Sequence, residues 1–156
     1  MEAGDSNSTL GAGSSTTIQE ALRLSVASVS IPSFSISPIE VKRGNTSIKY
    51  SNVPQWNAGS LTINDFIGLE GREALYAWRD LAFNVLTEKT GISADYKKTC
   101  YLQEYTPDYQ LVRTWKLIGC WISNVDDGTF SYEDSGVHQC TATLQYDKAV
   151  IDRSSD

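Results

Sequence analysis

The sequence has little positive charge, a single histidine and no long apolar run. Its 13 Lys and Arg residues are outnumbered by 19 Asp and Glu residues, so the formal net charge is −6. Tight binding of DNA or RNA needs a basic surface, so this balance argues against a nucleic acid as a firmly held ligand. It does not argue against DNA that passes without binding. No apolar stretch reaches the roughly 18–20 residues of a membrane-spanning helix, and the N-terminal residues do not resemble a signal peptide.

Cysteine is scarce as well. Cys100, Cys120 and Cys140 lack C-x-x-C spacing, which argues against a zinc site, and their odd number excludes a complete disulfide framework. We expect reduced thiols that pack as small apolar groups. The alternative is a hairpin that folds about residue 130. It would place Cys120 opposite Cys140 and allow a cross-strand or inter-subunit disulfide.

Catalytic and cofactor motifs are also missing. The chain has no P-loop, no H-E-x-x-H, no G-x-G-x-x-G and no G-x-S-x-G sequence. His138, which any imidazole-based catalysis would have to use, lies on the apolar face of an expected strand and is interpreted as a core residue. The acidic pairs Asp126-Asp127 and Glu133-Asp134 lack calcium-loop spacing and are interpreted as solvated turn charges. We therefore expect no enzyme activity, no metal site and no cofactor.

The chain is, by contrast, rich in residues that favour strands, including eight Tyr and four Trp. Residues 1–18 are rich in Ser, Thr and Gly and are expected to form a flexible arm. Residues 19–151 are expected to form one domain, followed by a C-terminal tail at residues 152–156.

Several strands follow from local patterns. Leu22, Leu24 and Val26 alternate with polar residues. The apolar residues that follow have odd instead of even numbers, which predicts a bulge near Ala27-Ser28. Pro32 and Pro38 frame a passage expected to be extended and rich in turns. A hairpin is predicted about Gly44-Asn45, after which "VPQWNAG" breaks the pattern and "SLTINDFI" resumes a strand.

One helix is predicted at about residues 70–86. Glu70 and Glu73 fall in its first turn, where carboxylates suit the helix dipole. Its apolar stripe recurs at helical spacing and is expected to face the core. The stripe consists of Leu75, Trp78, Ala82, Val85 and Leu86.

Two strands near the C-terminus carry the most information. The strand at 111–122 begins with polar and apolar residues in alternation, and its last residues are apolar on both faces. We expect the helix to cover the face of Trp115, Leu117 and Trp121. The face of Ile118, Cys120 and Ile122 is covered either by a neighbouring subunit or by a second layer of the same domain.

The last strand alternates most regularly and places an uncharged polar row opposite an apolar one; the polar row is Gln139, Thr141, Thr143 and Gln145. The fold class expected is mainly β (α+β): two packed antiparallel sheets, as a β-sandwich or small barrel, with one α-helix and an extended hairpin.

From about residue 20 to 150 the order of these features resembles the tail tube proteins of contractile-tailed bacteriophages. The segments that carry the resemblance are "SIPSFSISPIEV", "VPQWNAGSLTINDF", "ALYAWRDLAFNV", "RTWKLIGCWISNVDDGTFSYED" and "CTATLQYDKAV". Their order along most of the chain carries the resemblance more than any single motif. The Ser-rich arm and the three cysteines depart from the family pattern.

The resemblance implies a structural virion protein. Six copies would form a ring whose sheets join around a lumen, and rings would stack into the hollow inner tube of a contractile tail. Its partners would be further copies, the tail sheath protein, and the baseplate and tail terminator proteins. Genomic DNA would pass through the lumen during ejection without specific binding. The particle would be assembled in the bacterial cytoplasm.

Within that frame, two further surfaces are predicted. For ring stacking we expect the hairpin and the loop after it, with basic hairpin residues meeting acidic residues of the next ring. Trp56 has the alternative role of closing the end of its own core. The polar row of the last strand is the candidate lumen lining, although it can equally face the sheath. The stacking residues expected are Lys42, Arg43, Lys49, Pro54, Trp56, Asp126 and Asp127.

Two other functions stay open at this point. One is the tube protein of a type VI secretion or related contractile injection system, which shares the fold that the resemblance implies. The other is a β-sandwich ligand-binding module, in which exposed Trp and Tyr residues would form a stacking platform. Self-association that depends on concentration separates a tube protein from a binding module.

Overall fold

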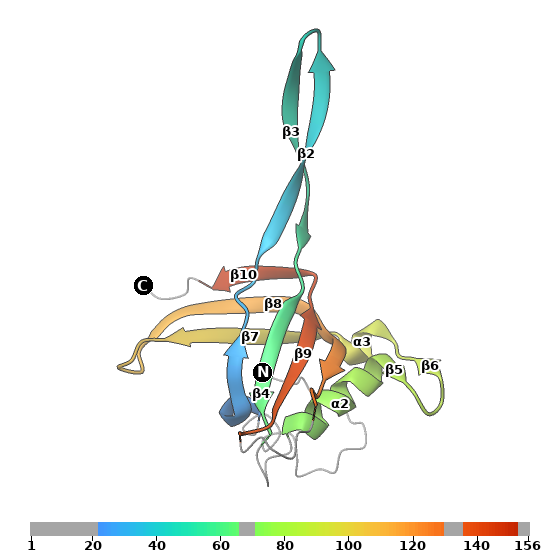
Figure 1. Ribbon diagram of the computed structural model, residues 1–156, viewed down its shortest axis with the longest axis vertical. Coiled ribbons are helices and arrows are strands. Elements are labelled where there is room, and N and C mark those ends of the chain that lie inside the picture. Colours follow the sequence, from blue (N-terminus) through green and yellow to red (C-terminus); the bar gives the residue numbers. More distant parts are fainter. Residues whose placement is uncertain (1–21, 66–70, 130–135, 153–156) are drawn as a thin grey trace.

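The computed structural model describes residues 22–65, 71–129 and 136–152 (Figure 1). The expected arm at residues 1–18 and Glu70 lie outside these ranges, as do Glu133 and Asp134. A helical turn at residues 22–25 comes first. The helices that follow are α2 (Gly71–Ala82) and α3 (Ser93–Tyr96). The strands are β1 (Val26–Val29), β2 (Phe34–Arg43), β3 (Thr46–Trp56), β4 (Gly59–Asn64), β5 (Phe83–Asn84), β6 (Lys89–Thr90), β7 (Lys98–Tyr105), β8 (Leu111–Asp126), β9 (Gln139–Gln145) and β10 (Lys148–Asp152).

The body of the protein consists of antiparallel strands arranged around β8. The first half of β8 lies between β7 and β10, and its second half pairs with β9, which continues through β4 to β1. In Figure 1 the strands β7, β8 and β10 run across the direction of β1, β4 and β9, so the two parts pack face to face at a large angle. The mainly β fold class with packed antiparallel sheets is confirmed.

The strand β8 changes its inward side at Gly119. Leu117 faces the core and pairs with Cys100 of β7 and Ala149 of β10. Gly119 then adopts a φ of 68°, which only glycine accepts readily. Beyond it Cys120 and Ile122 face the core, 0% and 1% exposed. These two residues are therefore covered by their own domain, and their assignment to an interface between subunits is wrong.

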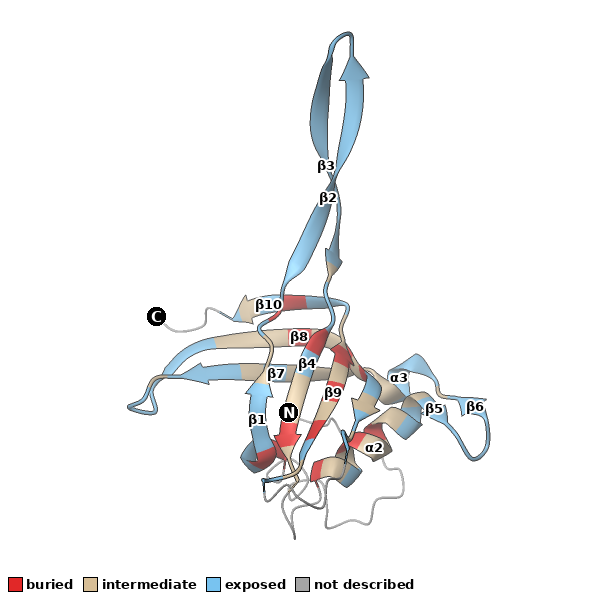
Figure 2. Cartoon of the chain, viewed as in Figure 1, coloured by how far each residue is buried: buried red, intermediate tan, exposed pale blue. Residues whose placement is uncertain are grey.

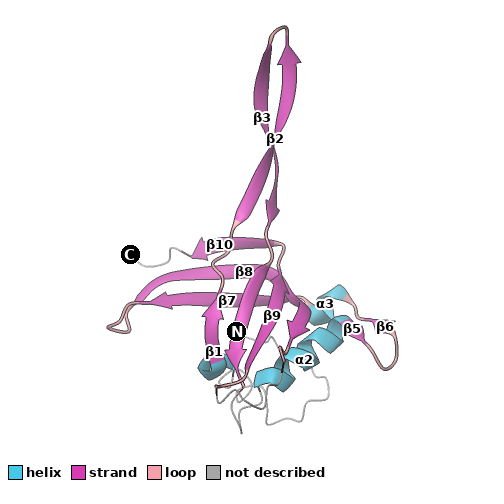
Figure 3. Cartoon of the chain, viewed as in Figure 1, coloured by secondary structure: helices cyan, strands magenta, loops and turns pink. Residues whose placement is uncertain are grey.

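The helix α2 packs against β8 and α3, as Figure 3 also shows. Leu75 and Trp78 of the predicted stripe are buried, and Glu73 lies in the first turn. The prediction that the helix extends to residue 86 is wrong, since α2 ends at Ala82. The Asn84 side chain accepts hydrogen bonds from the backbone N–H groups of residues 86 and 87 at 2.9 and 3.1 Å. This turn leaves Val85 and Leu86 of the predicted stripe exposed.

The described chain begins with helical geometry instead of the predicted strand. Leu22 and Ser25 are buried three residues apart, whereas Leu24 is exposed. That spacing matches one face of a helical turn. The predicted bulge is confirmed, because the pairing of β1 with β4 shifts register between Val26 and Ser28.

The predicted hairpin is longer than its sequence pattern indicated. Its turn is confirmed at Gly44, with φ of 58°. The passages expected to be turn-rich or to break the pattern instead belong to β2 and β3, with a register shift between Ile36 and Pro38. Because β2 and β3 pair only with each other among the described strands, neither has a second strand on its outer edge, where a proline costs no hydrogen bond. Figure 2 shows this hairpin projecting from the body and exposed along almost its whole length.

Candidate assembly surfaces

The outer part of the β2–β3 hairpin has one apolar and one polar face. Ile39 pairs with Tyr50, and Val41 pairs with Ile48. These four side chains are 37–53% exposed. Directly paired residues share a face in an antiparallel ladder, so they form one apolar surface, called here the hairpin apolar face. A monomer gains nothing by exposing such a surface, and this pattern is typical of a contact with another chain.

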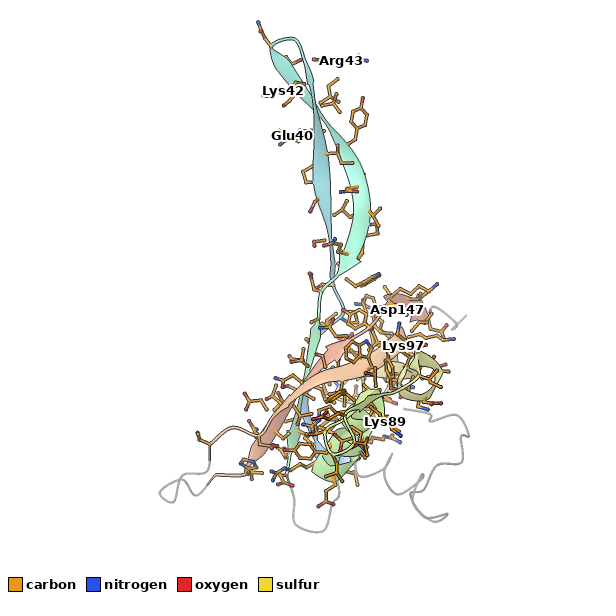
Figure 4. All side chains as sticks on the ribbon, turned by 90° about the vertical axis from the view of Figure 1, so that its right-hand side faces the viewer. Glu40, Lys42, Arg43, Lys89, Lys97 and Asp147 are labelled. Atoms are coloured by element: carbon orange, nitrogen blue, oxygen red, sulfur yellow. The ribbon has the colours of Figure 1, made fainter. Side chains whose placement is uncertain are left out.

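The basic residues predicted to mediate ring stacking lie on both sides of this hairpin. Glu40 pairs with Lys49, and their side chains form an exposed ion pair at 3.5 Å. Lys42 is paired with Ser47 on the same polar face. Figure 4 shows Glu40 and Lys42 pointing to one side of the hairpin and Arg43 to the other. The basic residues are thus displayed at the hairpin tip, as a docking role requires.

Trp56 lies at the base of the hairpin. Its ring centroid is 4.9 Å from that of Phe34 and 5.8 Å from that of Tyr146. The three rings connect β2, β3 and the end of β9, and Trp56 packs against the core. Burial raises the pKa of Tyr146, which also makes a backbone hydrogen bond with Ser33. Trp56 therefore closes its own core and fixes the direction in which the hairpin projects. Pro54, in contrast, lies opposite Ile36 within the hairpin.

The two acidic residues predicted to meet the next ring make contacts within the subunit. Asp126 accepts a hydrogen bond from the backbone N–H of Gly128 at 2.9 Å. Asp127 forms an ion pair with Arg72 Nε at 3.2 Å and accepts a hydrogen bond from the Cys140 thiol at 3.3 Å. Arg72 also reaches Asp65 at 3.4 Å. The Arg72 cluster (Arg72, Asp65, Asp127, Cys140) joins the start of α2 to the ends of β4 and β8 and to β9.

Opposing electrostatic effects act in this cluster. Desolvation acts to lower the pKa of Arg72, but the adjacent Asp127 and Asp65 outweigh it and the pKa is raised. Burial is the main cause that raises the pKa of Cys140 to about 12, and the hydrogen bond to Asp127 adds to it. The thiol therefore stays neutral as a donor to Asp127. The sequence gives no local pattern for this cluster, because its members are far apart along the chain.

The predicted polar row of β9 lies on an open face of the sheet. Thr141 and Thr143 are half-buried, whereas Cys140, Ala142 and Leu144 of the alternate positions are buried. The pairing extends the row over β4, with Thr62 beside Thr141, Ser60 beside Thr143 and Asn64 beside Gln139.

Hydrogen bonds tie this row together. The hydroxyls of Thr62 and Thr141 lie 3.4 Å apart, and Gln139 Nε2 donates to Asn64 Oδ1 at 3.1 Å. On the β8 side, Asn124 lies beside Thr143 and Asp126 beside Thr141. This surface, called here the polar sheet face, thus carries one carboxylate and no Lys or Arg among its paired residues. The alternation in "SLTIN" also indicates this extension onto β4, with Ser60, Thr62 and Asn64 on the polar side.

The alternative in which Cys120 lies opposite Cys140 and forms a cross-strand bridge is wrong. Ile122 pairs with Leu144, and Asp126 pairs with Thr141, so this pairing does not fold about residue 130. Cys140 lies instead beside Asp127 and pairs with Ile63 of β4. All three cysteines are free thiols.

No metal-binding group of three or more His, Cys, Asp or Glu side chains exists among the described residues. Within the same ranges, no helix is both long and apolar enough to cross a membrane. His138, half-buried, precedes β9, and its backbone carbonyl accepts a hydrogen bond from Asp65 N–H at 2.8 Å.

Comparison with known proteins identifies the family. The sequence profile of the T4-like virus tail tube protein gp19 family matches residues 16–150. The chain belongs to this family. It is therefore a structural tube protein of contractile tails, part of a phage tail or of a related injection particle. Membership decides against the ligand-binding module as an alternative. No curated protein matches the chain.

Solved structures share the fold of this tail tube protein. The tube-terminating cap of the anti-feeding prophage is 17% identical with a TM-score of 0.66, covering 81% of this chain and 79% of that one. The sheath–tube complex of the extracellular contractile injection system PVC gives 18% identity and a TM-score of 0.65, with 81% and 80% covered. The sheath/tube terminator of the same system gives 19% identity and a TM-score of 0.64, with 81% and 84% covered.

Proposed function

We propose that six copies of this tail tube protein close into a ring, and that rings stack into the hollow inner tube through which the genome leaves the particle. The observation that carries the proposal is the hairpin apolar face in a protein that belongs to a tail tube family. Ile39, Val41, Ile48 and Tyr50 are exposed to water in the described part of the subunit, and contact with another chain would bury them. Burial of apolar surface stabilises association by about 25 cal/mol per Å² before the entropic cost of binding.

In this proposal the hairpin docks on a copy in the adjacent ring. Within the described ranges, the core residues contact the hairpin only near its base, at Trp56. Its outer part can therefore bind a neighbour without disturbing the subunit. Lys42 and Arg43 at the tip set the register of docking through complementary charge. Since Asp127 is paired with Arg72 inside the subunit, the acidic partner on the next ring is better sought among exposed carboxylates away from the polar sheet face.

The polar sheet face is proposed as the lumen lining. Hydroxyl and amide groups can hydrogen-bond water, and the absence of Lys and Arg from this face leaves nothing to hold phosphates by counterion release. The carboxylate of Asp126 would repeat around the ring and repel a polyanion mildly. DNA could then slide past without binding.

Further partners are proposed by the same reasoning. A sheath would surround the tube, with a baseplate at one end and a terminator at the other, and assembly would take place in the bacterial cytoplasm. The likeness to subunits of the anti-feeding prophage and PVC particles favours a second candidate, a tube that carries another cargo in a contractile injection system. Extraction of nucleic acid from purified intact particles separates the two candidates, because a DNA-filled particle supports the phage tail and a DNA-free one the injection system.

The test places the same charge on either face of the hairpin. Val41→Glu disrupts the apolar face, and Ser51→Glu adds a carboxylate to the polar face opposite, away from Lys42 and Arg43 at the tip. Both positions are exposed in the subunit, so both variants should keep the wild-type circular dichroism and melting temperature. Negative-stain electron microscopy over a concentration series, with baseplate added as a nucleus, should show tubes from Ser51→Glu and none from Val41→Glu.

Charge reversal of Lys42 and Arg43 should also block growth of the tube while leaving the subunit folded. Normal tubes from Val41→Glu would refute docking through the apolar face. A reconstruction of the wild-type tubes from the same experiment locates the polar sheet face, and its position on the outer surface would overturn the proposed lumen lining.

A further inference from the structure

Two of the three thiols lie next to each other on paired strands. Cys100 is on β7 and Cys120 is on β8, and the pairing of these strands shifts register between Lys98 and Cys100. The change of side at Gly119 turns Cys120 towards the core that Cys100 also contacts. The side chains of Cys100 and Cys120 are hydrogen-bonded to each other.

We propose that Cys100 and Cys120 form a reversible cross-strand disulfide when the protein meets a disulfide oxidant such as oxidised glutathione. Nothing in the tube function requires this bond, so the inference stands apart from the proposed function. The bond would fasten β7 to β8. Among the described strands β7 pairs with β8 alone, so its outer edge is held by nothing else in the sheet.

The two thiols are suited to different steps of the exchange. Cys120 is fully buried, while Cys100 is partly exposed. The hydrogen bond from Cys120 lowers the pKa of Cys100, and the same bond, with burial, raises the pKa of Cys120. The thiolate is the nucleophile in thiol–disulfide exchange, so Cys100 reacts first.

The exchange balances with oxidised glutathione alone. The Cys100 thiolate attacks one sulfur of the oxidant, the S–S bond of glutathione breaks, and one glutathione thiolate leaves. The leaving thiolate takes up the proton of Cys120. The Cys120 sulfur then attacks the Cys100 sulfur of the mixed disulfide and releases the second glutathione as a thiolate, which takes up from water the proton that Cys100 had released. Two protein thiols are oxidised and one glutathione disulfide is reduced to two thiols.

Cys140 provides an internal control. Its thiol donates to Asp127 and its pairing partner across the ladder is Ile63. Its raised pKa keeps it in the unreactive thiol form. Oxidation should therefore leave one free thiol, and that thiol should be Cys140.

The experiment incubates the full-length folded protein with oxidised glutathione and counts thiols after denaturation. Digestion with trypsin and a Glu-specific protease separates the three cysteines, because Lys116, Glu133 and Lys98 provide cleavage sites between or before them. We expect two of the three thiols to be lost, and mass spectrometry to find the Cys100 and Cys120 peptides joined. Reductant should restore all three thiols.

Two variants test which cysteines form the bridge. Cys140→Ser should still form the bridge, whereas Cys100→Ser, at the partly exposed position, should form none and should keep the wild-type circular dichroism. The oxidised wild-type protein should melt at a higher temperature than the reduced protein, and Cys100→Ser should show no such shift. A joined Cys120–Cys140 peptide, a stable glutathione adduct without a bridge, or three free thiols after incubation would each overturn the proposal.

Discussion

Replacement of Gly119 by Ala tests whether β8 needs a glycine at the point where it passes from one part of the body to the other. Gly119 has a φ of 68°, and a Cβ at this position would collide with the side chain of Asp147. The Asp147 carboxylate is itself held by Lys97 Nζ at 3.0 and 3.1 Å, and the Asp147 backbone N–H donates to Ile118 at 2.9 Å. The Asp147 side chain is 57% exposed, so it can move aside only by giving up this ion pair.

The expected cost has three parts. A left-handed backbone costs a residue with a Cβ roughly 1–2 kcal/mol. An extra methyl group in a filled space costs roughly 1–3 kcal/mol. The reduced entropy of the unfolded chain returns about 0.4–1 kcal/mol. We expect the free energy of unfolding to fall by about 2–3 kcal/mol, which for a chain of this size lowers the melting temperature by roughly 4–12 °C.

Gly44→Ala is the matched control. Gly44 has a similar φ of 58°, but no atom lies within 4 Å of the position of its Cβ. The free energy of unfolding of Gly44→Ala should fall by only about 1 kcal/mol, which is the cost of the left-handed backbone without a collision. Urea unfolding of the unassembled subunit, followed by tryptophan fluorescence, measures both variants. The added variant Asp147→Ala should recover part of the loss in Gly119→Ala. Equal losses for Gly119→Ala and Gly44→Ala would refute the argument.

Two further predictions concern the Arg72 cluster. Arg72→Gln should lower the melting temperature more than Arg79→Gln, because Arg72 pairs with Asp65 and Asp127 from other elements whereas Arg79 pairs with its neighbour Asp80. The difference should shrink at about 1 M salt, and a difference that salt leaves unchanged would contradict an ionic origin. Cys140 should resist iodoacetamide at pH 9 in the folded protein, since its pKa is raised to about 12 from 9.0. The stability that comes from its neutral thiol is fully present below about pH 9 and is lost as the pH rises towards 12, and rapid alkylation of Cys140 at pH 9 would contradict this.

Local patterns in the sequence determined several elements correctly. The alternation at 139–145 predicted a strand with an apolar and a polar side, and β9 has both. The turn at Gly44-Asn45 and the burial of Leu75 and Trp78 were also readable. These features depend on residues that are close along the chain, where the periods of strand and helix act directly. The order of such features was enough to indicate the family.

Tertiary structure decided what lies on each side of β8 and which distant residues meet. The apolar residues on both faces of its second half raised the question of a neighbouring subunit, but one left-handed glycine moves Cys120 and Ile122 into their own core. A bulge of this kind moves the side chains that follow it to the other face, which brings Cys120 to the side of Cys100. The register of β8 with β9 places Cys140 beside Asp127 instead. The Arg72 cluster depends on the same registers, because no local period relates α2 to the ends of β4 and β8.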